Sequence, residues 1–235
     1  MKNANTTTKK RPVRPMKPET VRKYMSRATA RLDYYMSMPA DEFQAVHVSV
    51  SLGNSKLGKC LNVSLLPILT CPNCEHCCQY CYAVKSLRYP NVVDAWARNT
   101  AIARRDVERF FREVQDTIRR HPSYKGFRYQ VAGDVETARY FAGMVETADM
   151  FPAVKFWTYS KSPYAQTGRT RRLVVMDSTG FGKSYDLRKD AQFHCVHPGT
   201  VPPAGWYICP GNCEICIYAD RGCPAGENTC VNLHN

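Results

Sequence analysis

The stretch FRYQVAGDVETARYFAGMVETADMFPAVKFWTYS, residues 127–160, has the pattern of a strand, a turn, a helix and a second strand. Residues 127–131 alternate in polarity as a half-buried strand does. Apolar side chains then recur at helical spacing over residues 140–148, and a proline follows that ends the helix. Residues 154–160 form the next strand. A helix between two such strands predicts a parallel pair joined by a helical crossover.

The same alternation of strands and helices extends to both sides of this unit. Apolar periodicity predicts a helix over residues 20–38 and a long helix over residues 92–120. Short apolar runs predict one or two strands over residues 44–66 and a further strand over residues 171–176. The sequence therefore predicts an α/β fold with a shortened, partial (β/α) barrel-like parallel sheet.

Three segments of the chain differ in composition. Residues 1–32 hold ten Lys or Arg residues and one Glu, which is most of the net charge of +13. The prolines of KKRPVRPMKPE and the scarcity of apolar residues there predict an extended, mobile N-terminal arm. Residues 33–197 are expected to form the α/β core with the first cysteine cluster. Residues 198–235, rich in Pro, Gly and Cys, predict a small, loop-rich, metal-binding cap.

The basic arm has two interpretations. It is either a solvated tail or a segment that binds nucleic acid, because runs of basic residues mark both. In the second case its charges would contact phosphates, so a nucleic acid is the macromolecular substrate or partner that the sequence favours.

The compartment follows from the cysteines and from the apolar runs. No apolar run approaches the roughly 20 residues that cross a bilayer, and no signal-peptide pattern follows the basic N-terminus. The sequence thus predicts no membrane association and a cytoplasmic location. Because the cytosol keeps thiols reduced, the 12 cysteines are not expected to form disulfides, and metal binding is their first candidate role.

Five cysteines lie within CPNCEHCCQYCYA, residues 71–83. Three of them, Cys74, Cys78 and Cys81, have the spacing Cys-x3-Cys-x2-Cys. Three thiolates on one short loop can hold three irons of a [4Fe–4S] cluster, which ordinarily takes four cysteines. The fourth iron then stays open to bind a cofactor or a substrate.

A zinc knuckle is the alternative for this loop. The pairs Cys71-x2-Cys74 and Cys78-x2-Cys81 supply the four thiolates that a structural zinc ion takes. Only three residues separate these pairs, however, whereas zinc sites normally place a dozen or more residues between their halves. The spacing therefore favours an iron–sulfur cluster over zinc.

A second cysteine cluster occupies CPGNCEICIYADRGCPAGENTC, residues 209–230, and repeats the Cys-x3-Cys-x2-Cys spacing. Its candidate ligands are Cys209, Cys213, Cys216 and Cys223. Four thiolates in a loop-rich segment can close the coordination of a second iron–sulfur cluster or of a zinc ion, and one of them can instead complete the first site. These ligand sets leave the roles of Cys71, Cys77 and Cys230 open.

The first loop resembles the motif of the radical SAM superfamily, Cys-x3-Cys-x-aromatic-Cys, with Tyr80 as the aromatic residue before Cys81. The resemblance implies a cluster whose open iron binds the amino and carboxylate groups of S-adenosylmethionine. A reductant would supply an electron that splits the sulfonium bond into methionine and a 5′-deoxyadenosyl radical, which abstracts hydrogen from a substrate. The Gly-Gly-Glu-Pro segment of that superfamily is missing, and VAGDV, with Gly133 and Asp134, is the nearest substitute.

Asp134 therefore has two interpretations. As an N-cap it would accept backbone N–H bonds at the start of the helix expected near Val135. As a binding residue it would sit with Gly133 at the carboxyl end of a parallel strand, where α/β proteins build their sites, and accept the ammonium group of S-adenosylmethionine.

A larger part of the chain resembles the phage gene-product-eighty-eight family. The matching stretches include SLGNSKLGK, CYAVK, VAGDV, KFWTYSK and ICPGNCEIC, from about residue 51 to residue 216. This resemblance implies a phage-encoded protein in the host cytoplasm and no established activity.

Three functions compete on these features. The first is an iron–sulfur enzyme of the radical SAM type that acts on an unknown substrate, with nucleic acid as the candidate. The second is a zinc-stabilised nucleic-acid-binding protein without catalysis. The third is a protein whose clusters serve only structure or electron storage.

Overall fold

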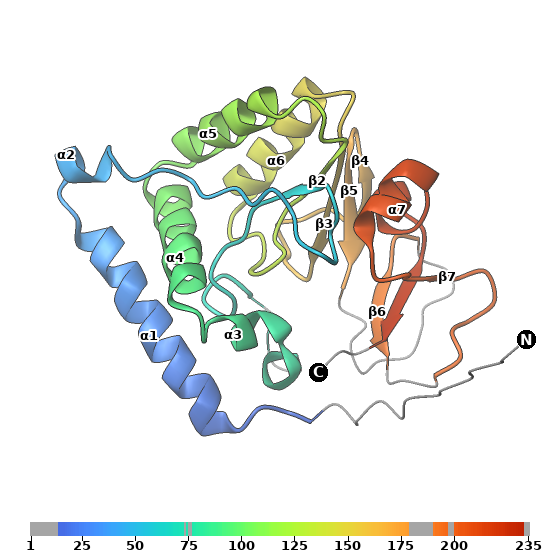
Figure 1. Cartoon of the computed structure of the whole chain (residues 1–235), viewed down its shortest axis with the longest axis horizontal. Coiled ribbons are helices and arrows are strands. Elements are labelled where there is room, and N and C mark those ends of the chain that lie inside the picture. Colours follow the sequence, from blue (N-terminus) through green and yellow to red (C-terminus); the bar gives the residue numbers. More distant parts are fainter. Residues whose placement is uncertain (1–13, 73, 75–76, 179–189, 197–199, 233–235) are drawn as a thin grey trace, which may run out of the picture.

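The computed structural model describes residues 14–72, 74, 77–178, 190–196 and 200–232 (Figure 1). The helices are α1 (Pro18–Ser37), α2 (Ala40–Phe43), α3 (Tyr82–Ser86), α4 (Pro90–Arg105), α5 (Val107–Arg120), α6 (Ala138–Met150) and α7 (Cys213–Ala219). The strands are β1 (Leu61–Asn62), β2 (Gly126–Arg128), β3 (Lys155–Ser160), β4 (Gly168–Thr170), β5 (Leu173–Asp177), β6 (Phe193–Val196), β7 (Tyr207–Ile208) and β8 (Thr229–Asn232).

The main sheet has the order β1-β2-β3-β5-β4. Its first four strands are parallel, and β4 pairs antiparallel with β5. The register places Phe127 beside Phe156 and Phe156 beside Leu173. Because the parallel strands lie side by side in chain order, as they do in part of a (β/α) barrel, the predicted α/β class with a parallel sheet is confirmed.

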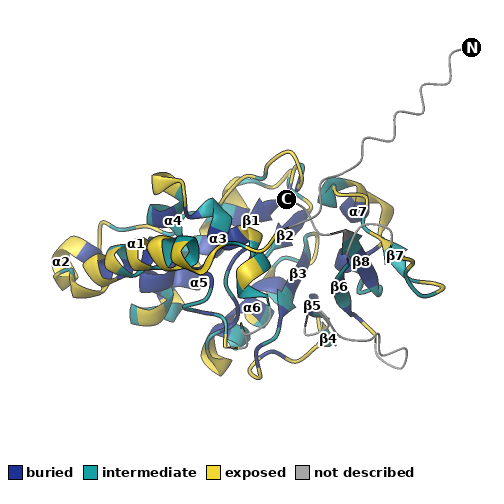
Figure 2. Ribbon diagram, turned by 90° about the horizontal axis from the view of Figure 1, so that it is seen from below, coloured by how far each residue is buried: buried dark blue, intermediate teal, exposed yellow. Residues whose placement is uncertain are grey.

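Both faces of the sheet are covered, as buried parallel sheets require. Side chains alternate between the faces, so that Phe156 joins the core beneath the helices while Trp157, the next residue, joins a second core beneath the C-terminal region. Val174 and Met176 in β5 share the face of Trp157. Figures 1 and 2 show α1, α4, α5 and α6 on one side of the sheet and α7 with β6–β8 on the other.

The prediction of one long helix over residues 92–120 is wrong, because the structure has two helices there, α4 and α5. The chain breaks at Asp106, whose side chain accepts the backbone N–H of Arg109 at 2.9 Å and so caps α5. Aspartate favours this position over a helix interior, since its carboxylate satisfies N–H groups that the first turn leaves unpaired. Two amphipathic helices can each turn an apolar face to the sheet where one straight helix could not.

Helix α1 confirms the helix predicted over residues 20–38. It packs along α4, buries Ala28 and Leu32, and is tied to α4 by a hydrogen bond of 2.7 Å from Arg31 Nε to Asp94. The predicted boundary between a basic arm and the core, at residue 32, therefore falls inside a packed helix. Residues 1–13, the most N-terminal part of that arm, lie outside the described residues.

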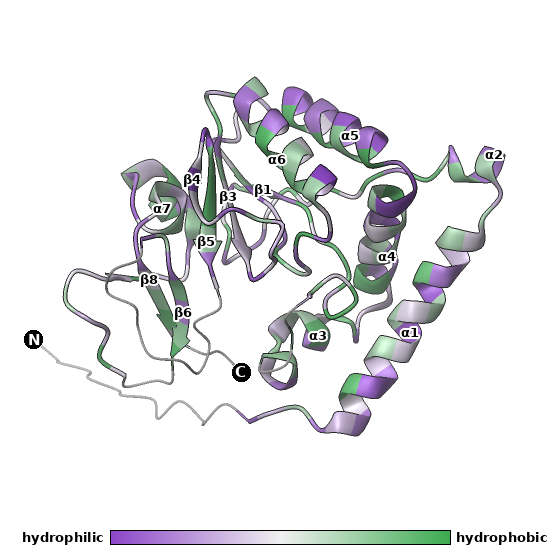
Figure 3. Cartoon of the chain, turned by 180° about the vertical axis from the view of Figure 1, so that it is seen from behind, coloured by the Kyte–Doolittle hydropathy of each residue, from purple (hydrophilic) through white to green (hydrophobic). Residues whose placement is uncertain are grey.

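Polar residues cover the outer side of the helical layer, as the hydrophilic colour along α1 and α5 shows (Figure 3). Both helices bury one apolar stripe and expose the remainder, which is typical of helices at the surface of a globular domain. None of the described helices combines the length and the apolar composition that crossing a bilayer requires.

The segment from residue 44 to residue 66 forms one strand, β1, as the prediction of one or two strands allows, and isolated bridges such as Ser51–Asn62. Glycines interrupt it. Gly53 has φ +107°, and a Cβ there would lie 2.1 Å from the carbonyl oxygen of Gly58, so the chain makes a tight turn that only glycine permits.

The C-terminal region agrees with the predicted small cysteine-rich cap and also contains a short sheet. Strands β6, β8 and β7 form a second, parallel sheet, and α7 packs against the loop at residues 54–59 through a hydrogen bond of 3.0 Å from the Cys213 N–H to the Lys56 carbonyl. The predicted boundary at residue 198 falls between β6 and β7 of this one sheet. We call β6–β8 together with α7 the cysteine cap.

Candidate metal and cofactor site

The carboxyl ends of the parallel strands bring the predicted site residues to one edge of the sheet. The chain that leaves β1 leads to the cysteine loop, residues 71–81, and the chain that leaves β2 leads to Gly133 and Asp134. Lys161 follows β3 directly, and its ammonium group donates to the Ser178 hydroxyl beyond β5 at 3.2 Å. Ligand sites of α/β proteins form at such edges.

Asp134 is a buried carboxylate, with 5% of its surface exposed. Its Oδ1 accepts the Ser160 hydroxyl at 2.5 Å and the Val135 N–H at 2.7 Å, and its Oδ2 accepts the Lys161 N–H at 2.9 Å. Burial raises the pKa of Asp134, against the lowering effect of these hydrogen bonds. The N-cap interpretation is wrong, because α6 begins only at Ala138 and its cap is Thr137.

Gly133 and Thr70 connect the turn that holds Asp134 (residues 133–134) to the start of the cysteine loop. Gly133 has φ +83°, and a Cβ there would lie 2.5 Å from Thr70 Oγ1 and 2.9 Å from Leu65 Cβ. Thr70 accepts the Asp134 N–H at 3.2 Å and donates to the Leu66 carbonyl at 2.8 Å. Because Thr70 is the residue before the first cysteine of the loop, the loop starts beside the carboxylate.

Three thiols of the loop are joined by side-chain contacts. Cys74 lies with its Sγ 4.0 Å from that of Cys77 and also forms a hydrogen bond with Cys71. The hydrogen bond with Cys74, together with the charge of Lys161, lowers the pKa of Cys77 to about 6, against the effect of burial. The pKa of Cys74 is raised because it keeps the shared proton. The thiolate, the form that binds metal, is therefore favoured at Cys71 and Cys77.

The other two cysteines of the loop lie in a short 3-10 turn and at its end. Cys78–Tyr80 forms that turn, and Tyr80 is half-buried, with its N–H donating to the Cys77 carbonyl at 3.0 Å. Cys81 precedes α3; burial raises its pKa to about 11, and it interacts electrostatically with Cys71 and Cys77. The ligand set Cys74, Cys78 and Cys81 stays a prediction, because the thiol contacts given above join Cys71, Cys74 and Cys77.

The four candidate ligands of the second cluster gather in the cysteine cap. Cys209 interacts electrostatically with Cys213, Cys216 and Cys223. Burial raises the pKa of each of these three thiols, that of Cys223 to about 12. The structure thus brings the predicted set into one region, where the uncharged thiols form part of the core beneath the cap. Cys230 is buried in β8.

Arg128 in β2 lies between the two groups of thiols. It donates to the Tyr82 hydroxyl at 3.4 Å, just after the first loop, and forms a hydrogen bond with Cys213 in the cap. Its guanidinium group lies 4.4 Å from the ring centre of Tyr159. Its Nε is buried and has no hydrogen-bond partner among the described residues. A buried cation with an unused donor is suited to negative charge that thiolates or a ligand would bring.

The donor chemistry of the loop fits a thiophilic metal. Every side chain in the contacting set is a thiol, which iron–sulfur clusters and zinc both take as ligand. Within the described residues, no three His, Cys, Asp or Glu side chains are already spaced as ligands of one ion. Metal binding at this edge would therefore require the thiols to draw closer together.

The thiols of the metal-free protein are expected to differ in reactivity. At pH 7 a thiol with a pKa of about 6 is mostly thiolate, whereas Cys81 and Cys195, both at about 11, are protonated. After allowance for the weaker nucleophilicity of a low-pKa thiolate, Cys77 should react with iodoacetamide about 100-fold faster than either. Tandem mass spectrometry of a labelling time course measures this. Equal rates at Cys77 and Cys81 would contradict the thiolate assignment.

The buried carboxylate predicts a pH dependence of stability. Since folding raises the pKa of Asp134, the folded protein holds this proton more tightly than the unfolded chain. The resulting stabilisation is present below the ordinary aspartate pKa of about 3.9 and is lost as pH rises through the folded value. Between pH 4 and pH 7 the wild type should lose stability relative to Asp134→Asn, as urea unfolding of both proteins measures. A constant difference between them would contradict this.

The comparisons with known proteins concern the region that holds the first loop and the Asp134 turn. A family model described as Gene product 88 matches residues 20–179, more than half of the 235 residues. No radical SAM family model matches the chain. The curated proteins gave no match, and the solved structures gave none either.

Proposed function

This chain belongs to the gene product 88 family of phage proteins, and from that premise we propose that it is an iron–sulfur protein that binds S-adenosylmethionine and starts radical chemistry. The observation that carries the proposal is the juxtaposition at one sheet edge of the cysteine loop, the buried carboxylate of Asp134 and the ammonium group of Lys161. Both Cys71 and Cys77 interact electrostatically with Asp134, so the carboxylate lies near these thiols.

The proposed ligands of a [4Fe–4S] cluster are Cys74, Cys78 and Cys81, which leave one iron open. A cluster held there would supply, once reduced by a partner, the electron that cleaves the sulfonium bond of S-adenosylmethionine. The chain's own part is to hold the thiols, to bind the cofactor and to keep water away from it.

Asp134 is proposed to accept the ammonium group of S-adenosylmethionine. A carboxylate offers about four lone-pair positions, and three are taken by Ser160, Val135 and Lys161. The remaining position is on Oδ2, which accepts only the Lys161 N–H among the described hydrogen bonds. A cation there would offset the cost of keeping a charged carboxylate buried.

Lys161 and Arg128 are proposed to balance the negative charge of thiolate ligands. Lys161 already lowers the pKa of Cys77, and Arg128 has an unused buried donor between the two groups of thiols. Positive charges beside a cluster ease its reduction. The electron itself would come from a reductant partner.

Product analysis tests the enzymatic proposal. Protein reconstituted with iron and sulfide without oxygen would be mixed with dithionite and S-adenosylmethionine, and methionine and 5′-deoxyadenosine would be measured. Asp134→Ala should retain its iron and lose cleavage at least tenfold. Asp106→Ala is the matched control, because this aspartate caps α5 and stands outside the site. Equal cleavage by both variants would contradict the role of Asp134.

A second function is favoured by the thiol contacts themselves. Cys71, Cys74, Cys77 and Cys81 have the spacing Cys-x2-Cys-x2-Cys-x3-Cys, a ligand run of bacterial ferredoxins. The structure links the first three by side-chain contacts and places Cys81 within electrostatic reach. In two-cluster ferredoxins the fourth cysteine of this run ligates the other cluster. If Cys81 instead completes the same cluster here, all four irons are ligated, no iron is open, and the cluster would store electrons or support the fold.

The zinc-stabilised nucleic-acid-binding protein remains the non-catalytic alternative. It uses the same thiols, and the described start of the basic segment lies beside the loop, where the Met16 N–H donates to the Gln79 carbonyl at 2.8 Å. Colour separates the two cases. Cluster protein prepared without oxygen should be brown, whereas zinc protein is colourless.

A further inference from the structure

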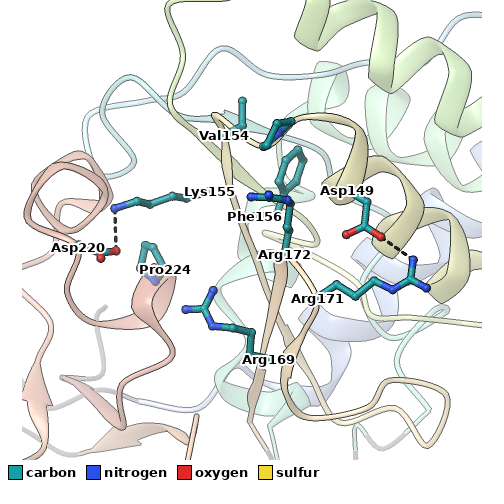
Figure 4. Close-up of a pocket in the computed structure, with 10 residues that line it drawn as sticks. Asp149, Val154, Lys155, Phe156, Arg169, Arg171, Arg172, Asp220 and Pro224 are labelled. Atoms are coloured by element: carbon teal, nitrogen blue, oxygen red, sulfur yellow. Dashed lines mark hydrogen bonds and ion pairs between the residues drawn. The ribbon is translucent and has the colours of Figure 1, made fainter.

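A basic groove lies at the opposite edge of the sheet from the cysteine loop. A cavity of about 640 Å³ opens where β3 begins, between the β4–β5 hairpin and the end of α7 (Figure 4). Four of the side chains that line it are cationic and two are acidic. The cationic ones are Lys155, Arg169, Arg171 and Arg172, and the acidic ones are Asp149 and Asp220.

Two of the four cations are already neutralised. Lys155 forms an ion pair of 2.8 Å with Asp220, and Arg171 forms one of 2.7 Å with Asp149. Figure 4 shows the other two guanidinium groups between these ion pairs. Arg169 donates to the Ala225 carbonyl at 3.1 Å and interacts electrostatically with Asp220, and among the described residues no carboxylate forms an ion pair with it or with Arg172. The groove therefore carries an uncompensated charge of about two units.

The hairpin that holds the arginines has an unfavourable backbone for its sequence. Thr170 pairs with Leu173, so Arg171 and Arg172 are the two residues of a tight turn. Arg171 has φ +52°, a conformation that favours glycine, asparagine or aspartate. The turn places Arg172 beside Arg171 at the groove.

We propose that this groove binds the phosphodiester backbone of a nucleic acid. The planar guanidinium fork matches phosphate oxygens in two-point hydrogen bonds. A concave groove receives a strand of phosphates, whereas a membrane surface is flat. The aromatic residue in the lining, Phe156, is 1% exposed and cannot stack on a base. Binding is therefore sequence-independent and strongly dependent on salt.

This site is separate from the basic N-terminal segment and rests on no metal. It lies at the amino ends of the parallel strands, across the sheet from the residues proposed to bind the cofactor. The two proposals are therefore independent: evidence against the iron–sulfur cluster would not count against nucleic-acid binding at the groove, and evidence against binding at the groove would not count against the cluster.

The test measures how salt weakens binding of the full-length, anaerobically purified chain to a fluorescent 20-base-pair duplex, between 50 and 200 mM KCl. The plot of log affinity against log salt has a negative slope, and each lost phosphate contact reduces the magnitude of this slope by about 0.9. Arg169→Ala with Arg172→Ala should therefore reduce this magnitude by about 1.8, with similar losses on duplexes of different sequence. The double variant Arg119→Ala with Arg139→Ala, on α5 and α6, removes the same charge from exposed ion pairs and should leave the slope unchanged.

Arg171→Gly supplies a second control, from inside the groove itself. Glycine adopts the positive φ without a Cβ clash, and because Arg171 is already paired with Asp149, its loss should leave the slope unchanged, as in the Arg119 and Arg139 control. An unchanged slope in the Arg169 and Arg172 double variant would overturn the proposal. So would an equal loss in the Arg119 and Arg139 control, or a loss seen with anionic vesicles and not with the duplex.

Discussion

Replacement of Cys78 by serine is expected to remove the [4Fe–4S] cluster from the first loop, whereas replacement of Cys77 is expected to leave it in place. A serine hydroxyl does not replace a thiolate as an iron ligand, and only Cys78 belongs to the register with Cys74 and Cys81. Iron bound per chain should fall by about four in the first variant. Iron and sulfide analysis after anaerobic reconstitution measures it.

The two cysteines form a matched pair, because they are adjacent, chemically identical and both half-buried. The opposite result, with iron lost from Cys77→Ser and kept by Cys78→Ser, would contradict the open-iron register. It would establish the closed set of Cys71, Cys74, Cys77 and Cys81, and with it a redox or structural role. Loss in neither variant would place the iron in the cysteine cap.

Replacement of Gly133 by alanine is expected to destabilise the fold by about 2–5 kcal/mol. The left-handed backbone costs a side chain about 1–2 kcal/mol, and a Cβ 2.5 Å from Thr70 Oγ1 adds the cost of overpacking, about 1–3 kcal/mol. Gly205 offers a control at the same φ of +83°, with no atom within 4 Å of its Cβ position. Gly205→Ala should cost about 1–2 kcal/mol.

Urea unfolding of both variants and of the parent measures the difference. The amount by which Gly133→Ala lowers the free energy of unfolding more than Gly205→Ala does measures the contact between the turn at Asp134 and the start of the cysteine loop. An equal cost in the two variants would show that Thr70 moves aside freely, and it would contradict a rigid connection between the carboxylate and the thiols.

The sheet could be predicted because its signals are local. Phe156 and Trp157 sit in a strand pattern that a helix precedes, and such a unit builds parallel sheets whatever surrounds it. The break at Asp106 was missed because apolar spacing runs on through it, so that only the capping preference of one aspartate marks the end of α4. The β6–β8 sheet was missed because β7 has two residues and carries no periodicity.

The candidate site was predicted in its chemistry and only partly in its geometry. Asp134 could be selected because it follows a strand, but the competition between capping and burial depends on where α6 begins. Arg128 was missed. Its signal is a charged residue inside a strand whose neighbours Phe127 and Tyr129 are buried, which puts it on the opposite face, toward the cysteine cap. That the cap covers this face is a tertiary fact that no local pattern contains.

The central claim is an iron–sulfur cluster with an open iron at the carboxyl edge of the sheet. Iron, sulfide and zinc analysis of the anaerobically reconstituted chain, together with a low-temperature EPR spectrum of the dithionite-reduced protein before and after addition of S-adenosylmethionine, tests it most directly. The account predicts bound iron and sulfide and a cluster signal that changes when the cofactor is added. Stoichiometric zinc without iron, or a cluster signal that the cofactor leaves unchanged, would contradict it.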